Sequence, residues 1–110
     1  MEQQDAILEA RRLIRAARSA SLATGQAGQP FVSLVTPASA GDLYPLMLLS
    51  SLSEHTRHLR ADPRCALLFT GAPTGPNPQT APRVTVTGLA EEVPAAAVAA
   101  LKARWLAVHP

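Results

Sequence analysis

Apolar side chains recur at every third or fourth position near the start of the chain, which is the spacing of one face of an α-helix. Four arginines fall mostly on the other sides, and the segment contains neither glycine nor proline. The pattern predicts an amphipathic helix over about residues 4–18, with solvated arginines toward its C-terminal end. The apolar positions are Ile7, Ala10, Leu13, Ile14 and Ala17.

Short apolar runs follow this helix, and they are typical of strands. The runs 20–24 and 31–36 are separated by residues 25–30, which include two glycines and a proline. A glycine-bearing loop of this length between strand-like runs predicts a β-hairpin. Small residues at 38–42 indicate another turn, and the apolar run 46–49 predicts a third strand.

Two further strands are predicted in the second half of the chain. Residues 65–70 are apolar enough to indicate a strand buried on both faces. Residues 71–82 contain four prolines, which exclude a helix or a central strand and predict an exposed loop. Residues 83–89 alternate, with Val84 and Val86 on one face, as a half-buried antiparallel strand does.

The C-terminal segment is alanine-rich and opens with proline, which predicts a helix over about residues 94–108. The length of 110 residues allows one domain, with the strands between about residues 20 and 92. Short links between neighbouring strands favour antiparallel pairing and a mainly β, α+β architecture. The apolar face of the last helix would comprise Val98, Leu101, Trp105 and Val108.

Composition narrows the possible functions. With 47% hydrophobic and 16% charged residues, the chain is too apolar to be disordered. Its apolar runs are too short to cross a bilayer, its N-terminus does not resemble a secretion signal, and its one cysteine cannot form an internal disulfide. A net charge of +2 and four aromatic residues give no basis for a nucleic-acid partner. We therefore expect a cytoplasmic protein that binds neither membrane nor nucleic acid.

Residues 50–63 carry the most informative polar pattern. Ser51 and Glu54 have the spacing of a capping box, which predicts a short helix from Leu52 until the Asp-Pro pair at 62–63. Free amides at a helix start attract anions, and nearby hydroxyl groups and arginine add hydrogen bonds suited to phosphate. The residues of this first turn support two interpretations equally, a phosphate site and an ordinary capped connector. They are Ser53, His55, Thr56 and Arg57.

Other kinds of site find little support. His55 and His58 lie three positions apart, but no third ligand has suitable spacing, so no metal site is expected. Cys65 lies in an apolar run and is interpreted as a core residue rather than a nucleophile. The chain has no P-loop and no nucleophile elbow.

Four segments in this order resemble the pyridoxamine 5′-phosphate oxidase-related FMN-binding split barrel, nearest to the branch with the HugZ-type haem oxygenases. The segments read QPFVSLV at 29–35, LLSSLSEHTRHL at 48–59, DPRCALL at 62–68 and PRVTVTG at 82–88. The resemblance implies an antiparallel split β-barrel with flanking helices. It also implies a homodimer with FMN at the subunit interface, and flavin-dependent oxidoreductase activity. Members usually continue beyond the equivalent of Pro110, so the barrel would lack its last strand unless a partner supplied it.

The resemblance also assigns site residues. Ser33, Leu34 and Val35 would contact the flavin ring, and Leu49 and Ser50 would lie beside the ribityl chain. The phosphate would be surrounded by Ser53, His55 and Arg57, and Arg83 would reach the flavin from the second subunit.

The chain departs from the oxidases at two positions, with Ser33 where they have arginine and His55 where they have lysine. Their substrate-binding residues, and the haem-ligating histidine of the HugZ-type enzymes, lie beyond the equivalent of Pro110. Neither named activity therefore transfers directly. The alternatives are a haem-binding or haem-degrading protein with His55, His58 or His109 as axial ligand, and a barrel that only dimerises.

Overall fold

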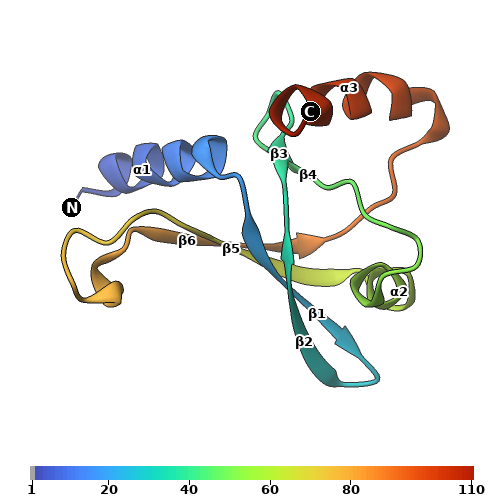
Figure 1. Ribbon diagram of the computed structural model, residues 1–110, viewed down its shortest axis with the longest axis horizontal. Helices are drawn as coiled ribbons and strands as arrows, with labels where there is room; N and C mark the ends of the chain where they lie inside the picture. The colour runs from blue at the N-terminus through green and yellow to red at the C-terminus, as the bar shows by residue number, and fades with distance from the viewer. Residues whose placement is uncertain (1) are drawn as a thin grey trace.

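The computed structural model describes residues 2–110 and shows an antiparallel sheet with three flanking helices (Figure 1). The elements in chain order are α1 (Gln3–Ala16), β1 (Ala20–Gln26), β2 (Gln29–Val35), β3 (Ala38–Ser39), β4 (Pro45–Leu46), α2 (Glu54–Ala61), β5 (Arg64–Thr70), β6 (Arg83–Leu89) and α3 (Val98–Val108). Short 3₁₀ turns at Pro78–Thr80 and Ala95–Ala97 precede β6 and α3. Within residues 2–110, no helix combines the length and the apolar character that a bilayer span requires.

The main sheet has four strands in the order β2-β1-β5-β6, and every neighbouring pair is antiparallel. The strands β3 and β4 form a separate antiparallel pair. This arrangement confirms the predicted antiparallel sheet with flanking helices. Over the described residues the sheet stays open rather than closing into a barrel, so β2 and β6 are its two edges.

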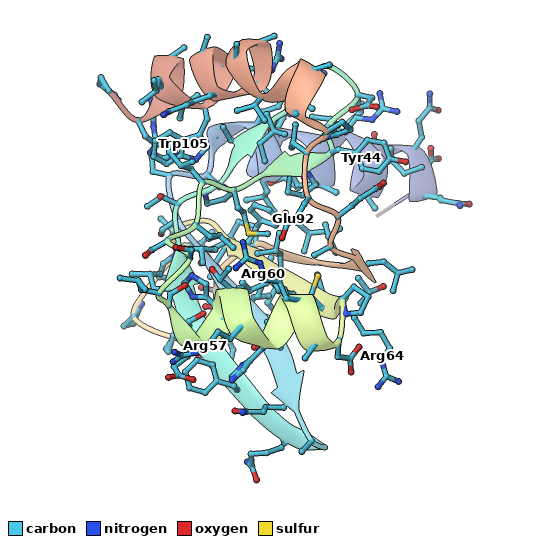
Figure 2. The ribbon with its side chains drawn as sticks, turned by 90° about the vertical axis from the view of Figure 1, so that its right-hand side faces the viewer. Tyr44, Arg57, Arg60, Arg64, Glu92 and Trp105 are labelled. Atoms are coloured by element: carbon cyan, nitrogen blue, oxygen red, sulfur yellow. The ribbon has the colours of Figure 1, made fainter. Side chains whose placement is uncertain are left out.

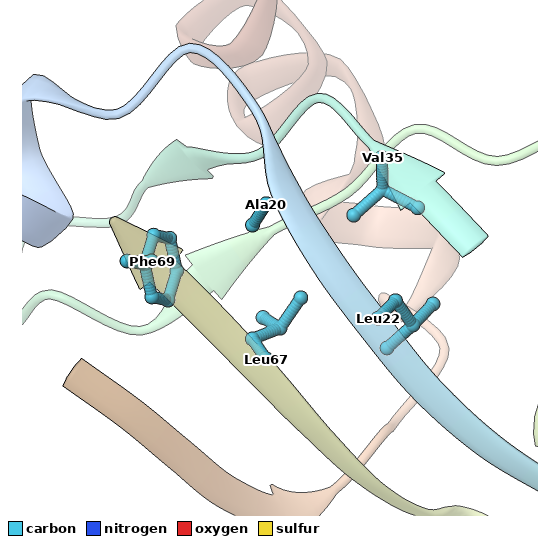
Figure 3. Packing of buried hydrophobic residues seen from close by; sticks show 5 residues of the cluster. All are labelled: Ala20, Leu22, Val35, Leu67 and Phe69. Carbon is cyan, nitrogen blue, oxygen red and sulfur yellow. The ribbon is translucent and has the colours of Figure 1, made fainter. Parts of the chain in front are cut away.

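The core lies on one face of this sheet, where β1, β2 and β5 contribute alternate side chains (Figure 3). Leu22 and Phe69 are its largest fully buried side chains. The cluster is completed by Ala20, Val35 and Leu67. Ile14 and Ala17 from the N-terminal region pack against the cluster, and Figure 1 shows α1 and α3 on the same side of the molecule.

The opposite face of the sheet is uncovered. Side chains on this outer face alternate with the buried ones, and Val32, Leu34 and Leu68 are 65%, 74% and 39% exposed. The prediction that residues 65–70 are buried on both faces is therefore wrong within a single chain, although the predicted strand is present as β5. Its apolar composition reflects a second face that no element of residues 2–110 covers.

The predicted strand 46–49 is also wrong for most of its length. Only Pro45 and Leu46 pair, as β4, with β3, which occupies the start of the predicted turn at 38–42. Met47 and Leu49 instead pack against the core cluster from an irregular segment. The apolar pattern of residues 47–49 therefore reflects burial against the core and not pairing with another strand.

The helix α3 is tied to the link between β2 and β3 by side-chain hydrogen bonds to backbone oxygens. Trp105 donates from Nε1 to the Thr36 carbonyl at 2.8 Å, and His109 lies with Nε2 2.8 Å from the Pro37 carbonyl. Arg104 donates to the carbonyl of Ser39. The C-terminal helix thereby fixes the backbone that continues directly from β2.

The hairpin of β1 and β2 is longer than the sequence predicts. Its strands pair as far as Gln26 and Gln29, which leaves a two-residue turn at Ala27 and Gly28 instead of a loop over 25–30. Both turn residues have positive φ, 49° and 83° respectively. This combination matches the type I′ turn, whose twist suits paired strands. Pro30 is accommodated because β2 is an edge strand.

We expect Ala27→Asn to raise the free energy of unfolding by about 0.5–1 kcal/mol, because asparagine tolerates the left-handed backbone better than alanine does. Ala27 is exposed, so no packing is lost. Denaturant midpoints at an unchanged slope would measure the gain. The control Ala27→Val should be destabilised because β-branched residues disfavour positive φ. Equal stability of all three proteins would contradict the turn assignment.

Candidate functional site

A pocket of about 250 Å³ lies between the end of β2 and the chain that leads into α2. Two segments separated in the sequence build it, and it includes six of the residues that the resemblance assigns to the flavin site. Its lining consists of Leu34, Val35, Thr36, Leu48, Leu49, Ser50, Ser53 and His55. Thr36 and Leu48 are lining residues that the sequence does not predict, although each directly adjoins a predicted site residue, Val35 or Leu49.

The pocket combines apolar and polar walls. The apolar side chains come from β2 and from the irregular segment before α2, whereas Ser50, Ser53 and His55 belong to the approach and first turn of α2. Leu34 and Leu48 are 74% and 49% exposed, so apolar surface continues from the pocket onto the outside of the chain. Such a pocket suits a ligand with a flat apolar part and a hydrogen-bonding part.

The helix at the polar wall begins two residues later than predicted. It starts at Glu54 with Ser53 as N-cap residue, and the capping box between Ser51 and Glu54 is not formed. The Leu52 amide instead donates a hydrogen bond to the Ser50 hydroxyl oxygen at 3.1 Å, which places residues 50–52 in a turn. A hydrogen bond between the serine side chain and the nearby backbone therefore forms a turn here in place of a longer helix.

Two hydroxyl groups converge on the carbonyl oxygen of Ser50. Ser53 and Thr56 donate to it at 2.9 and 2.6 Å, and their hydroxyl oxygens are 2.7 Å apart. The Ser53 hydroxyl therefore does not cap the helix. The first backbone amides of α2 have no intrahelical acceptor, and the helix dipole adds partial positive charge there. These donors favour an anion beside the pocket.

Arg57 lies on α2 near this wall but does not line the pocket. Its guanidinium forms an ion pair with the Glu54 carboxylate one turn earlier, and both side chains are more than half exposed. Figure 2 shows Arg57 at the surface of α2. Arg57 can reach an anion at the helix start only by sharing or leaving Glu54, which makes this carboxylate a local competitor for the guanidinium.

The three histidines occupy different environments. His55 lines the pocket, and its Nδ1 lies 3.0 Å from the Ser33 hydroxyl, so Ser33 adjoins the pocket through His55. His58 is 3% exposed and has both ring nitrogens in hydrogen bonds. His109 is engaged with the Pro37 carbonyl. Of the three axial ligands considered from the sequence, His55 is the one that lines this pocket.

Arg83 lies far from the pocket of its own chain. It begins β6, three strands away from β2, which corresponds to roughly 14 Å across the sheet. Its Nη1 donates to the carbonyls of Gln79 and Ala81 at 2.9 and 3.3 Å. Within one chain the structure does not bring Arg83 together with the other predicted residues.

A second hollow, of about 350 Å³, lies beside the tip of the β1–β2 hairpin and is larger than the first. Its charged residues, Asp62 and Arg64, form an ion pair with each other at 2.8 Å. Hydrogen bonds from the Arg64 side chain and amide lower the pKa of Asp62 to about 2. Because these charges satisfy each other, the smaller pocket is the better candidate site.

Cys65 is half-buried on β5 and does not line either hollow. Burial raises the pKa of its thiol, which lowers the thiolate fraction at neutral pH. This agrees with the interpretation of Cys65 as a packing residue. Over residues 2–110 there is also no group of three histidine, cysteine or carboxylate side chains placed to hold a metal ion.

A protein-family model described as pyridoxamine 5′-phosphate oxidase matches residues 8–109 of the chain. Among curated proteins, the chain is 37% identical over 83 residues to the chloroplastic non-canonical haem oxygenase HOZ of Arabidopsis thaliana. That alignment covers 76% of this chain and 25% of the relative. The chain thus spans about a quarter of the length of the curated relative that it matches.

Two solved structures are similar over nearly the whole chain. A haem-binding protein from Mycobacterium smegmatis superposes with a TM-score of 0.86 at 29% identity, covering 98% of this chain and 45% of that one. A FAD-binding protein from Mesorhizobium loti superposes with a TM-score of 0.75 at 25% identity, covering 93% of this chain and 72% of that one. The same architecture thus occurs in proteins named for haem and for flavin.

Proposed function

The chain belongs to the pyridoxamine 5′-phosphate oxidase family, and from this premise we propose that it binds FMN in the pocket between β2 and α2. We propose further that it does so as a homodimer and that it is a flavin-dependent oxidoreductase. The observation that carries the proposal is the pairing of an apolar wall with the anion-attracting start of α2 in one pocket.

The residues present suit the parts of FMN in turn. Leu34, Val35 and Leu49 offer apolar contacts for the ring system, and Ser50 offers a hydroxyl for the ribityl chain. The amides at the start of α2, together with Ser53, His55 and Arg57, would hold the phosphate. The bound flavin would supply the redox chemistry, and the role of these residues is to bind and orient it.

The size of the pocket supports a second copy of the chain. Its volume of about 250 Å³ is smaller than the roughly 300–1,000 Å³ of common ligand sites, and its apolar rim is exposed. One chain therefore provides only part of the enclosure that a flavin needs. Docking of a second copy would complete the wall, and Arg83 of that copy would then be available to the ligand.

The uncovered sheet face supports the same assembly. Val32 and Leu34 on β2 and Leu68 on β5 place apolar surface on the face opposite the core, and Leu34 also belongs to the pocket. Exposed apolar patches of this kind mark interaction surfaces. The surface that would form the interface is therefore continuous with the proposed flavin site.

Titration with FMN tests the proposal directly, and the chain contains a built-in reporter. Trp105 is the only tryptophan, and it donates to the carbonyl of Thr36, which lines the pocket. We expect bound FMN to quench the fluorescence of Trp105, in parallel with a shift of the flavin absorbance. A folded protein that neither shifts the flavin spectrum nor loses tryptophan fluorescence would refute FMN binding.

We expect Arg57→Ala to weaken FMN binding by about 1–3 kcal/mol, the usual cost of removing a charged hydrogen-bond partner. Riboflavin, which has no phosphate, should bind both proteins with similar affinity. The matched control is Arg60→Ala on the same helix, since Arg60 donates to Glu92 at 2.8 Å and points toward it (Figure 2). An Arg57→Ala protein with the affinity of the wild type would remove this residue from the site.

Haem is the second candidate ligand, and the position of His55 in the pocket favours it. The curated relative and one of the two structures described above are named for haem. On this alternative, haem addition would give a Soret band that His55→Ala loses and His109→Ala retains. A wild-type protein that binds FMN and gives no Soret band would exclude it.

A further inference from the structure

His58 is a buried histidine that the proposed flavin site does not use. It is 3% exposed and lies on the inner face of α2, beneath the ring of Phe31, which it meets edge to face at a centroid distance of 4.9 Å. Its Nδ1 is 2.9 Å from the hydroxyl of Thr24, and its Nε2 is 3.0 Å from Oε1 of Gln26. Thr24 is itself buried, at 6% exposure.

The two hydrogen bonds engage both nitrogens of the ring. Because the carbonyl oxygen of Gln26 can only accept, Nε2 carries the hydrogen and donates to it. Nδ1 pairs with the Thr24 hydroxyl, which can donate or accept. The ring thus uses both nitrogens inside the fold, with the Glu54 carboxylate 3.8 Å from Nε2, and neither nitrogen remains for a haem iron or another metal ion.

These hydrogen bonds matter because the other side-chain hydrogen bonds from α2 to distant parts of the chain are only partly buried or exposed, at His55 to Ser33 and at Arg60 to Glu92. The helix has eight residues, too few to be stable alone, and its buried residues are Thr56 and His58. Leu59 adds a partly buried apolar contact with the core. The position of α2 on the sheet is therefore set largely by directional polar contacts, which fix orientation more sharply than apolar contacts do.

The two histidines of α2 connect it to neighbouring strands. His55 contacts Ser33 on β2, and one turn later His58 contacts Thr24 on β1 and the ring of Phe31 on β2. Ser33 and Phe31 are two positions apart on the strand and so share a face, as His55 and His58 do on the helix. A helix that lost the His58 contacts could tilt about the first turn, and this turn carries the proposed phosphate ligands.

We propose that His58 is a positioning residue, and that its buried hydrogen bonds to Thr24 and Gln26 hold the first turn of α2 in the geometry that receives the phosphate of FMN. The consequence for FMN rests on the proposed function. The fixation of α2 itself is a property of the ligand-free chain. His58 acts through the helix and does not touch the ligand.

The test compares His58→Leu and Thr24→Val with the conservative variant His58→Gln, which can still accept from Thr24. We expect the first two to weaken FMN about tenfold, which corresponds to the loss of one buried hydrogen bond. Riboflavin affinity should change less than FMN affinity in both, and His58→Gln should retain most of the FMN affinity. Equal weakening of FMN and riboflavin, or no weakening, would overturn the positioning role.

Amide hydrogen exchange on the ligand-free proteins separates this inference from the proposed function. In His58→Leu and Thr24→Val, the amides of α2 should exchange faster, whereas those paired between β5 and β6 keep their protection. A wild-type protein that binds no flavin would refute the proposed function, and the exchange result would still decide whether His58 fixes the helix. Unchanged protection of α2 would refute the fixation whatever the protein binds.

Discussion

Phe69→Ala is expected to lower the free energy of unfolding by about 3–5 kcal/mol, the cost of truncating a fully buried phenylalanine. Phe69 is 1% exposed and belongs to β5, which lies between β1 and β6 in the sheet. It belongs to the same core cluster as Ala20 and Leu67 (Figure 3). A domain of this size has only about 5–15 kcal/mol in total, so the variant would be close to unfolding.

Equilibrium denaturation followed by circular dichroism would measure this loss. Leu89→Ala is a suitable control because it removes a leucine side chain that is 73% exposed at the end of β6. We expect it to change the free energy by less than about 0.5 kcal/mol, as exposed substitutions generally do. If the two variants were equally stable, Phe69 would not be a central core residue.

Much of the fold could be predicted because its strands carry a local signal. The alternation at 83–89 predicts β6 correctly, with Val84 and Val86 on the inner face and Thr85 on the outer face. The proline-rich segment before it is indeed a loop apart from one 3₁₀ turn. These features depend only on residues that are neighbours in the sequence, so the sequence pattern is sufficient to predict them.

The features that could not be predicted depend on contacts between distant residues. The apolar run at 47–49 reads as a strand, but it packs on the core without a strand partner, which only the tertiary structure decides. The sequence alone allows His58 as an axial ligand, but in the structure its Nδ1 is hydrogen-bonded to Thr24, 34 positions earlier in the chain. Gln26 contacts His58 as well. It does so from the end of β1, because the strands of the hairpin pair further than the glycines and proline of residues 25–30 predict.

The candidate site was predictable in part, and for two separate reasons. The anion-attracting start of α2 follows from the residues themselves, since a serine stands at the start of a short helix and a histidine and an arginine lie in its first turn. The opposite wall, at Leu34 and Val35, came from the family resemblance, because no local pattern links β2 to α2. The structure places both walls around one pocket, whereas it leaves Arg83 at the far edge of the sheet.

The outer sheet face gives the prediction with the largest effect on assembly. We expect the wild-type chain to be a dimer and Val32→Glu to raise its dissociation constant by about 100-fold, because a symmetric interface would bury the new charge twice. Val32 is 65% exposed in the single chain and lies outside the pocket between β2 and α2. The variant should therefore fold normally, and its effect on the assembly can be measured separately from stability.

Sedimentation over a range of concentrations would follow dissociation, and FMN titration of the same samples would show whether the site needs the second copy. Leu8→Glu is the control, since Leu8 is 46% exposed on α1, which packs on the core side of the sheet. FMN affinity should fall with the dimer fraction in Val32→Glu and stay constant in Leu8→Glu.

A monomeric wild type would refute the homodimer, and a dimer that tolerates Val32→Glu would place its interface on another surface. Full FMN affinity in a monomeric Val32→Glu protein would show that one chain encloses the flavin alone, contrary to the argument from pocket size.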